Sequence, residues 1–418
     1  MSAKLIAGSA SPVPEFDVAV VGAGPVGASL ACALGQAGAK VAVLEASPVR
    51  APLPPSYDDR PLALAHGSRR ILEAIGAWQA LAARATPIRE IHVSERGGFG
   101  VTRIEAAATG VDALGHVIPA RDLGESLAAV MAATPGLDLR RPAEVTALDA
   151  DDKGVTLRLR GAGGDRRPLR ARLVAAADGV DSPLRAMLGI RVRDRDYRQR
   201  AITANVSCSR PTAGRAFERF TPTGPLALLP LGEHRCALVW AMPEELAEQR
   251  MHASKKEFVA ALAAAAGGRL GDFTRLGERV GYPLRLVRAL DSIAPRAVIL
   301  GNAAHNLHPV AGQGLNLGLR DAAVLAEVVS DALCGGADPG EPAVLARYRG
   351  LRRGDQRLVT VFTDTLVRAF SNASPGLRVL RDLGLLALDL TPALKDRFAA
   401  QAMGRAGFQG RLSLGLPL

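Results

Sequence analysis

Glycines gather at two places that lie far apart in the chain and that could each contact a nucleotide ligand. GAGPVG occupies Gly22 to Gly27, and GNAAHNLHPVAGQGLNLGLRD occupies Gly301 to Asp321. Glycine lets the backbone approach a flat or anionic group closely, and the free N–H groups at a helix N-terminus bind phosphate. The two stretches therefore predict two contact regions, which one long dinucleotide could bridge.

The first stretch lies within a predicted βαβ unit. The apolar run FDVAVV precedes it, a helical segment follows, and the strand VAVLE ends in Glu45. We expect Gly22 to make the tight turn, Gly24 to let the backbone approach a pyrophosphate, and Gly27 to let helix and strand pack closely. The Glu45 carboxylate would bind ribose hydroxyls and would repel a 2′-phosphate, which disfavours NADP at this site.

The second stretch lies between a predicted strand, Ala297 to Leu300, and a predicted helix that starts near Gly314. Apolar residues recur along this helix at the spacing of one buried face, namely at Leu315, Leu319, Ala322, Ala326, Val329 and Leu333. A helix N-terminus stabilises negative charge, which an isoalloxazine ring gains on reduction. FAD therefore fits the two contact regions better than NAD does.

Several motifs occur in a fixed order along the chain: GAGPVG with Glu45, DDRPLAL, ARDLGES, Asp178-Gly179 and GNAAHNLHPVAGQGLNLGLRD. Together with SRRILEAIGAW, AFERFTPTGPLALLPL and YPLRL, they resemble the single-component flavoprotein aromatic hydroxylases over most of Phe16 to Met403. Within that family the resemblance is greatest to the hydroxylases of ubiquinone biosynthesis. The asparagine in GNAAH and the AFERFTPTGPLALLPL stretch favour the 2-polyprenyl-6-methoxyphenol hydroxylase subgroup.

The resemblance implies a set of FAD contacts. Residues expected at the ADP half are Gly22, Gly24, Gly27 and Glu45, with Asp178 and Gly179 near the pyrophosphate. Residues expected at the flavin nucleotide are Arg60, Arg121 and, on the ribityl chain, Asn302. Residues expected to face the isoalloxazine are Pro309, Gly312, Gln313, Gly314, Leu315 and Asn316. An asparagine at position 302 accepts a hydroxyl hydrogen bond, but without the strength that a charged carboxylate adds.

Histidines and apolar residues supply further candidates. His305 and His308 could act as bases toward a phenol, but such residues more often orient a loop by hydrogen bonds. No metal site is predicted, since the histidines show no metal-ligand spacing. Four residues of a strand-rich middle segment could face the substrate, with ordinary sheet core as the alternative: Phe217, Phe220, Leu228 and Pro230.

The predicted fold is α/β. It comprises a Rossmann-like FAD-binding domain of the para-hydroxybenzoate hydroxylase type, an inserted mixed β-sheet substrate domain and C-terminal helices. The expected segments are a flexible tail at 1–15, the FAD domain at 16–81, 117–188 and 297–336, the substrate domain at 82–116 and 189–296, and helices at 337–418. No second GxGxxG fingerprint is free for a nicotinamide cofactor. NADH or NADPH would therefore bind transiently, without a Rossmann domain of its own.

The resemblance implies an FAD-dependent monooxygenase that hydroxylates a polyprenylated phenol in ubiquinone biosynthesis. NAD(P)H would be the reductant, molecular oxygen the co-substrate, and a flavin 4a-hydroperoxide the oxygenating species. Two alternatives stay open: an FAD-dependent reductase of a prenyl-type substrate, and a non-catalytic flavin-bound scaffold of a quinone-synthesis complex. A flavin halogenase is disfavoured, because Trp78 and Trp240 do not form the paired-tryptophan motif of that class.

Composition limits the partners. The formal net charge of +11 on the chain of 418 residues fits either an arginine-rich compositional bias or a specific anionic partner. Aromatic residues make up 4% of the sequence, and no dense basic run interleaves with them, so no nucleic-acid partner is expected. The four cysteines form no CxxC motif, which favours reduced thiols in the cytoplasm.

The expected substrate resides in the bilayer, yet no apolar run approaches the ~20 residues that a spanning helix needs. We therefore expect a peripheral contact at the inner face of the membrane. The segment LRVLRDLGLLALDL, Leu377 to Leu390, predicts an amphipathic helix. Its apolar face comprises Val379, Leu383, Leu386 and Leu390, and nearby positive charges come from Arg368, Arg378 and Arg381. The alternative is that this helix packs on the FAD domain.

Overall fold

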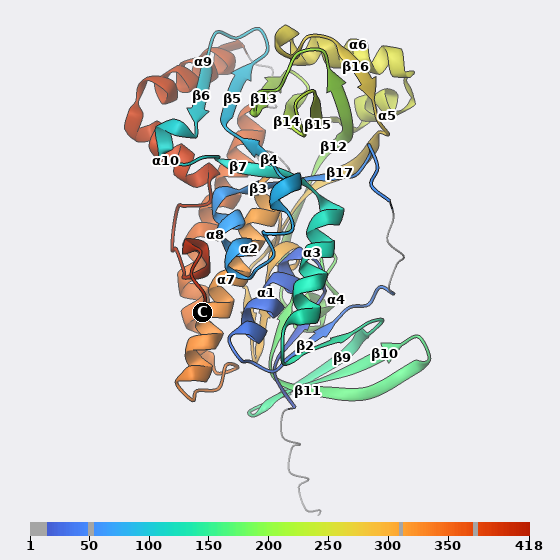
Figure 1. Cartoon of the computed structure of the whole chain (residues 1–418), viewed down its shortest axis with the longest axis vertical. Coiled ribbons are helices and arrows are strands. Elements are labelled where there is room, and N and C mark those ends of the chain that lie inside the picture. The colour runs from blue at the N-terminus through green and yellow to red at the C-terminus, as the bar shows by residue number, and fades with distance from the viewer. Residues whose placement is uncertain (1–14, 49–53, 309–311, 371–374) are drawn as a thin grey trace, which may run out of the picture.

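The computed structural model describes residues 15–48, 54–308, 312–370 and 375–418. Two large sheets lie toward opposite ends of its long axis, and helices run between and beside them (Figure 1). The predicted tail lies outside the described residues except for Glu15, whose backbone N–H bonds to the carbonyl of Arg170.

The first sheet has the strand order β18-β19-β11-β1-β2-β8. Its parallel strands are β1 (Phe16–Val21), β2 (Val41–Leu44), β8 (Leu137–Arg140), β11 (Gly164–Ala176) and β19 (Ala297–Ile299). Antiparallel strands extend it, namely β9 (Glu144–Asp151), β10 (Gly154–Gly161) and β18 (Ile293–Ala294). The associated helices are α1 (Pro25–Gln36), α2 (His66–Ala74), α3 (Ala120–Ala133), α4 (Pro183–Met187) and α7 (Gln313–Cys334). Strands β1, β2 and β19 are almost wholly buried, as parallel strands covered by helices are.

The second sheet has the order β20-β17-β12-β15-β14-β13-β5-β6, with β16 beside β12. Its strands are β5 (Glu90–Glu95), β6 (Val101–Glu105), β12 (Val192–Cys208), β13 (Arg215–Thr221), β14 (Gly224–Pro230), β15 (Arg235–Pro243), β16 (Phe273–Leu276), β17 (Val280–Ala289) and β20 (His305–Asn306). Helices α5 (Glu244–His252) and α6 (Lys255–Ala266) accompany it. Phe258 of α6 packs in one buried cluster with Trp240 of β15, so these helices cover one face of the sheet.

A small third sheet joins the two large ones (Figure 1). It comprises β3 (Pro61–Ala65), β7 (Gly115–Pro119) and β4 (Thr86–Ile88), in the order β3-β7-β4. Strand β4 lies in the predicted substrate-domain segment 82–116 and pairs with β7, which continues into α3 beside the first sheet. The boundary between the two regions is therefore a shared sheet and not a linker.

The α-helices described after α7 are α8 (Pro342–Phe370), α9 (Pro375–Leu390) and α10 (Pro392–Ala402). Helix α9 packs on β5 and β6, as Figure 1 shows, and not on the first sheet. The hydroxyl of Thr102 donates to the carbonyl of Leu385 over 2.7 Å, and Gly100 N–H donates to Asp382 over 3.0 Å. Arg381 forms an ion pair with Glu95 in which both side chains are less than a tenth exposed. The expectation that Arg381 supplies surface charge is therefore wrong.

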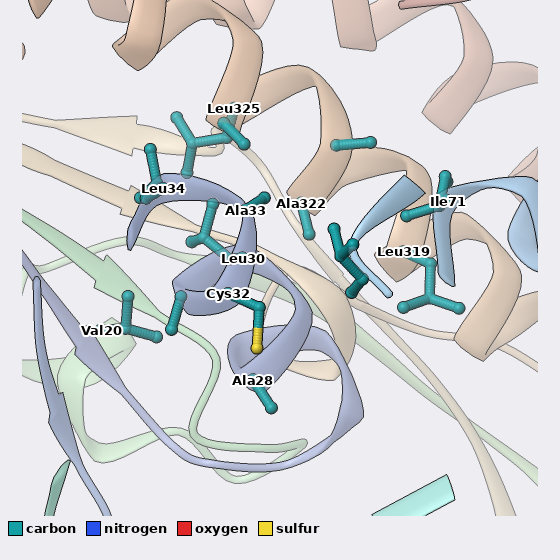
Figure 2. Packing of buried hydrophobic residues seen from close by; sticks show 14 of the residues in the cluster. Val20, Ala28, Leu30, Cys32, Ala33, Leu34, Ile71, Leu319, Ala322 and Leu325 are labelled. Atoms are coloured by element: carbon teal, nitrogen blue, oxygen red, sulfur yellow. The ribbon is translucent and has the colours of Figure 1, made fainter. Parts of the chain in front are cut away.

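The core beneath the fingerprint forms where α1 packs on α7. Figure 2 shows Leu30, Ala33 and Leu34 of α1 lying against Ala322 and Leu325 of α7. The apolar face predicted for α7 is present, since Leu319, Ala322, Ala326 and Val329 are all buried. Alanines at this contact let the two helices approach closely, which fixes the N-terminus of α7 relative to the fingerprint.

Buried charges join α7 to α8. Asp321 of α7 accepts a hydrogen bond from Arg352 of α8 over 2.7 Å, and Arg320 donates to Asp355 over 2.9 Å. His305 also contacts Asp321, at 2.8 Å. Burial raises the pKa of Asp321, but Arg352 and His305 outweigh this effect and hold the pKa well below its ordinary value. The carboxylate therefore stays charged in the interior, compensated by its partners.

We expect Arg352→Met to destabilise the protein by about 3–5 kcal/mol, because Asp321 and Asp355, which both pair with Arg352, would each lose a buried partner. Urea unfolding followed by circular dichroism measures the loss. The matched control is Arg347→Met, which breaks the half-exposed pair of Arg347 with Asp331 and should cost at most about 1 kcal/mol. Equal effects of the two variants would contradict this account of the network.

Candidate functional site

The fingerprint glycines have three distinct environments. Gly22 has a φ of +99°, and a Cβ there would lie 2.4 Å from the carbonyl oxygen of Ala177. A Cβ on Gly27 would lie 2.0 Å from the carbonyl oxygen of Gly22. Gly24 is the N-cap of α1 and has open space where its Cβ would be. The first two positions thus require glycine for the turn and the helix contact, and Gly24 leaves the backbone accessible at the helix N-terminus.

Glu45 stands directly after β2 and is held by the fingerprint itself. Its carboxylate accepts hydrogen bonds from the N–H of Ala23 over 2.9 Å and from the N–H of Ser47 over 2.8 Å. Burial raises the pKa of Glu45, but these hydrogen bonds more than offset the effect, and the pKa lies below its ordinary value. The group is therefore an anion fixed beside the fingerprint turn, as a partner of ribose hydroxyls needs to be.

A cavity of about 1090 Å³ extends from the N-terminus of α1 to the second sheet. At the first end the lining residues include Gly24, Gly179, Gly301, Asn302 and Gly314. The glycines among them leave the backbone accessible to a ligand. At the far end its wall is mostly apolar and includes Ile91, Val93, Ala216, Phe220, Leu229, Leu385, Leu388 and Phe398. One continuous cavity thus connects the end at the N-terminus of α1, where a nucleotide would bind, to an apolar chamber closed by α9 and α10.

The second glycine stretch contributes to the first end of this cavity. Gly312 has a φ of +59° and is the N-cap of α7, and Gly314 has open space at its Cβ position. Gln313 and Leu315 also line the cavity. Asn316 does not: its side chain accepts from the N–H of Ala65 over 2.7 Å and donates to the carbonyl of Gly312 over 2.7 Å. Asn316 therefore fixes the loop that would face the ring.

The predicted contacts outside the βαβ unit differ in position. Arg60 lines the cavity and stacks over the ring of Tyr282 at 4.9 Å. Arg121 is paired with Asp59 over 3.1 Å and is not among the described lining residues. Asp178 accepts from the hydroxyl of Ser182, the N-cap residue of α4, over 2.5 Å and from the N–H of Leu184 over 3.1 Å, so it is engaged at the N-terminus of α4. Of these three side chains, Arg60 is the one directed to the cavity.

Tyr57 holds the segment that carries Arg60, a role that the sequence analysis did not predict. Its ring lies between the guanidinium groups of Arg235 and Arg275, at 4.3 and 3.8 Å. Asn205 donates to the backbone carbonyls of Tyr57 and Asp59, over 2.7 and 3.0 Å. Residues of the second sheet therefore position Arg60 at the cavity, where the FAD-binding region would hold its ligand.

The histidines near the second stretch are buried parts of the scaffold. His308 packs edge-on against Tyr197, with ring centroids 5.5 Å apart, and burial lowers its pKa to about 4. It is not among the described residues that line the cavity. A catalytic contact of His308 with a ligand there therefore has no support in this geometry. Pro309, the other candidate near the reaction, lies outside the described residues.

Strand alternation separates the four candidates for substrate contact. Phe220 lines the cavity and packs on Val93 and Leu385. Phe217 also lines the cavity, but its ring belongs to the cluster with Trp240 on the other face of the sheet. Leu228 is buried in that same cluster, and Pro230 is not among the described lining residues. The sequence missed Glu218, which lies between the two phenylalanines and lines the cavity.

The arrangement fits FAD. Three glycines with open Cβ positions, Gly24, Gly179 and Gly314, line one wall, and two helix N-termini, those of α1 and α7, lie at it. These features accept an anionic diphosphate at one place and a flat ring that gains charge at another. No group of histidine, cysteine and carboxylate side chains among the described residues could hold a metal ion.

Comparison with known proteins identifies the family. The model of the FAD binding domain family matches residues 15–360. A ubiquinone hydroxylase of Rhodospirillum rubrum is 39% identical, with 99% of this chain and 95% of the relative covered. The 3-demethoxyubiquinol 3-hydroxylase of Escherichia coli is 33% identical, with 93% and 98% covered. The fold is similar to that of p-nitrophenol 4-monooxygenase from Pseudomonas putida, with a TM-score of 0.77 at 22% identity and with 95% and 99% of the two chains covered.

The fold, the glycines that line the cavity and these matches define an FAD-dependent monooxygenase with an aromatic-hydroxylase architecture. More narrowly, the chain belongs to the family of FAD-dependent ubiquinone hydroxylases. The family resemblance found in the sequence is thereby confirmed, as are the predicted fold class and FAD as the cofactor.

We expect Gly314→Leu to retain FAD, at full or reduced occupancy, and to lose hydroxylation. Its Cβ has free space, so the backbone tolerates the change, but the side chain would enter the cavity beside α7. Flavin content by absorbance and product by mass spectrometry separate the two effects. Gly124→Leu is the control, since Gly124 is an exposed position of α3 with equal space. Unchanged product formation by Gly314→Leu would refute the assignment of this stretch to the reactive ring.

Proposed function

We propose that this chain hydroxylates the ring of a polyprenylated phenol on the route to ubiquinone, with NAD(P)H and molecular oxygen as co-substrates. The observation that carries the proposal is the single cavity that joins the flavin-type end to an apolar chamber between the second sheet and the helices α9 and α10. Relatives that act in ubiquinone biosynthesis are similar over nearly the whole chain. A prenylated ring is largely apolar, so this chamber suits it.

The residues would divide the work as follows. Bound FAD would supply the redox chemistry, namely the acceptance of electrons from NAD(P)H and the activation of oxygen. The ADP half would contact Gly24 and the Glu45 region, and the flavin end would contact Arg60, Asn302, Gly312 and Gly314. Phe220 and Leu229 would position the ring and exclude water, which protects a reactive intermediate from hydrolysis. The N-terminus of α7 would stabilise negative charge on the ring that faces it.

A membrane contact would deliver the substrate. No helix among the described residues meets the length and apolarity that crossing a membrane requires. Helix α9 has two apolar faces: Leu385 and Leu388 line the cavity, whereas Leu383, Leu386 and Leu390 are 48%, 37% and 70% exposed. Leu394, in the helix α10 that directly follows α9, is also 47% exposed. The side chains of Arg368, Arg378 and Val379 lie outside the described part.

The proposed function has a direct cellular test. Cells without the gene should accumulate a prenylated phenol that lacks one ring oxygen, as identified by mass spectrometry of lipid extracts. The purified protein should consume oxygen and form hydroxylated product in equal amounts. Product without oxygen uptake would instead support a prenyl-substrate reductase. Normal quinone synthesis by a variant without substrate-stimulated NAD(P)H oxidation would support a scaffold.

The membrane contact predicts co-sedimentation with vesicles of anionic phospholipid. Leu383→Glu combined with Leu386→Glu should abolish sedimentation, because two charges would enter the apolar face, while FAD stays bound. Lys256→Glu with Glu244→Lys, far from α9 on the helices of the second sheet, preserves net charge and should leave sedimentation intact. Loss of FAD in the α9 variant, or sedimentation equal to that of the unaltered protein, would refute the contact.

A further inference from the structure

Glu218 is a carboxylic acid in an apolar wall. It lies on β13, and its cross-strand neighbours are Val93 of β5 and Ala227 of β14, which also line the cavity. Ala216 and Phe220, two residues away on the same face, line it as well. Among the described lining residues, Glu218 is the one with a carboxyl group. The small side chain of Ala227 leaves room beside it.

The carboxyl group of Glu218 lacks compensation within the protein. Its Oε1 atom is buried and has no hydrogen-bond partner among the residues that the structure describes. Natural proteins rarely retain such a group for stability, since a buried unpartnered carboxyl costs free energy. The nearby charges on this face, Arg381 and Glu95, are paired with each other. A buried polar group directed into a cavity without a partner indicates that the partner is the ligand.

We propose that Glu218 is a catalytic residue that binds the ring hydroxyl of the substrate and accepts its proton. The inference rests on the proposed function, since a phenol is the ligand that would present this hydroxyl to an otherwise apolar chamber. The O–H bond of the phenol breaks, its proton forms a new O–H bond on the Glu218 carboxylate, and the electron pair remains on the phenolate oxygen. The phenolate ring is the more electron-rich and so reacts more readily with an electrophilic oxygen.

The environment of Glu218 suits proton transfer near neutral pH. Burial raises its pKa to about 7, and catalysis is most effective when the pKa of the base lies near the working pH. His92 of β5 packs on Phe217, on the opposite face of the sheet. The helices contribute Phe362 from α8, Gln401 from α10 and Arg381 from α9 to this part of the cavity. His92 faces away from the cavity, and the side chains of Phe362, Gln401 and Arg381 accept no proton near neutral pH, so the role falls to Glu218.

The test compares holoenzyme with Glu218→Gln over a range of pH, with a short-chain prenylated phenol as substrate. The unaltered enzyme should lose kcat/KM as the pH falls through about 7, because the carboxylate becomes protonated. Glu218→Gln should reduce kcat/KM by about 10²-fold above that pH and should abolish the acid limb. A ring-fluorinated analogue, whose hydroxyl ionises without help, should recover most of the lost rate.

Controls separate a catalytic role from a structural one. Glu218→Gln should keep FAD and should melt at the same or a higher temperature, since a buried unpartnered carboxyl is removed. Glu105→Gln alters an exposed carboxyl of the same sheet and should change neither rate nor pH profile. A variant at Glu218 that keeps the acid limb, or that loses FAD and melts earlier, would overturn the inference while leaving the proposed function intact. Absence of any hydroxylated product from the unaltered holoenzyme would overturn the proposed function and the inference with it.

Discussion

The charge network between α7 and α8 is the constraint on which the site depends. Asp321 bonds to Arg352 within the interior and also contacts His305, so it joins α8 to β20, which follows the Asn302 segment. Burying such charges gains little stability over apolar residues of equal volume, but it penalises every packing in which one partner is missing. The network therefore fixes one register of α7 against α8. That register sets where the N-terminus of α7 and the loop at Asn302 meet the cavity.

Local sequence rules predicted the nucleotide end well because its determinants are local. A tight turn, a helix N-terminus and an acidic strand end all lie within one βαβ unit, and Gly22, Gly24 and Glu45 stand where those rules put them. Their roles in binding stay predictions. Contacts made by side chains across the fold were harder to foresee. Arg121 and Asp178 are engaged within the protein, by Asp59 and by the N-terminus of α4.

The substrate wall shows why composition alone misleads in a strand. Phe217 and Phe220 are three residues apart, and the two-residue period of a strand places them on opposite faces. An apolar stretch in AFERFTPTGPLALLPL therefore could not be assigned wholly to substrate. The face that lines the cavity includes Glu218, which the sequence analysis passed over. Its alternation with Phe217 was the available signal, but which face meets the ligand depends on α6, which covers the other one.

Completion of the chamber depends on segments distant in sequence. Most of the sequence separates helix α9 from β5 and β6. The helix is nevertheless fixed to these strands by Arg381, Asp382 and the backbone of Leu385. Helical periodicity predicted an apolar face with Leu383 and Leu386. Leu385 and Leu388 repeat at the same three-residue spacing on another side of the helix, and the structure shows that this side lines the cavity. Helix α9, which is apolar on both sides, is thus a wall one helix thick between the apolar chamber and the exterior. Such a wall is what the proposed substrate would need, since its ring would reach the flavin end while its tail would remain in lipid.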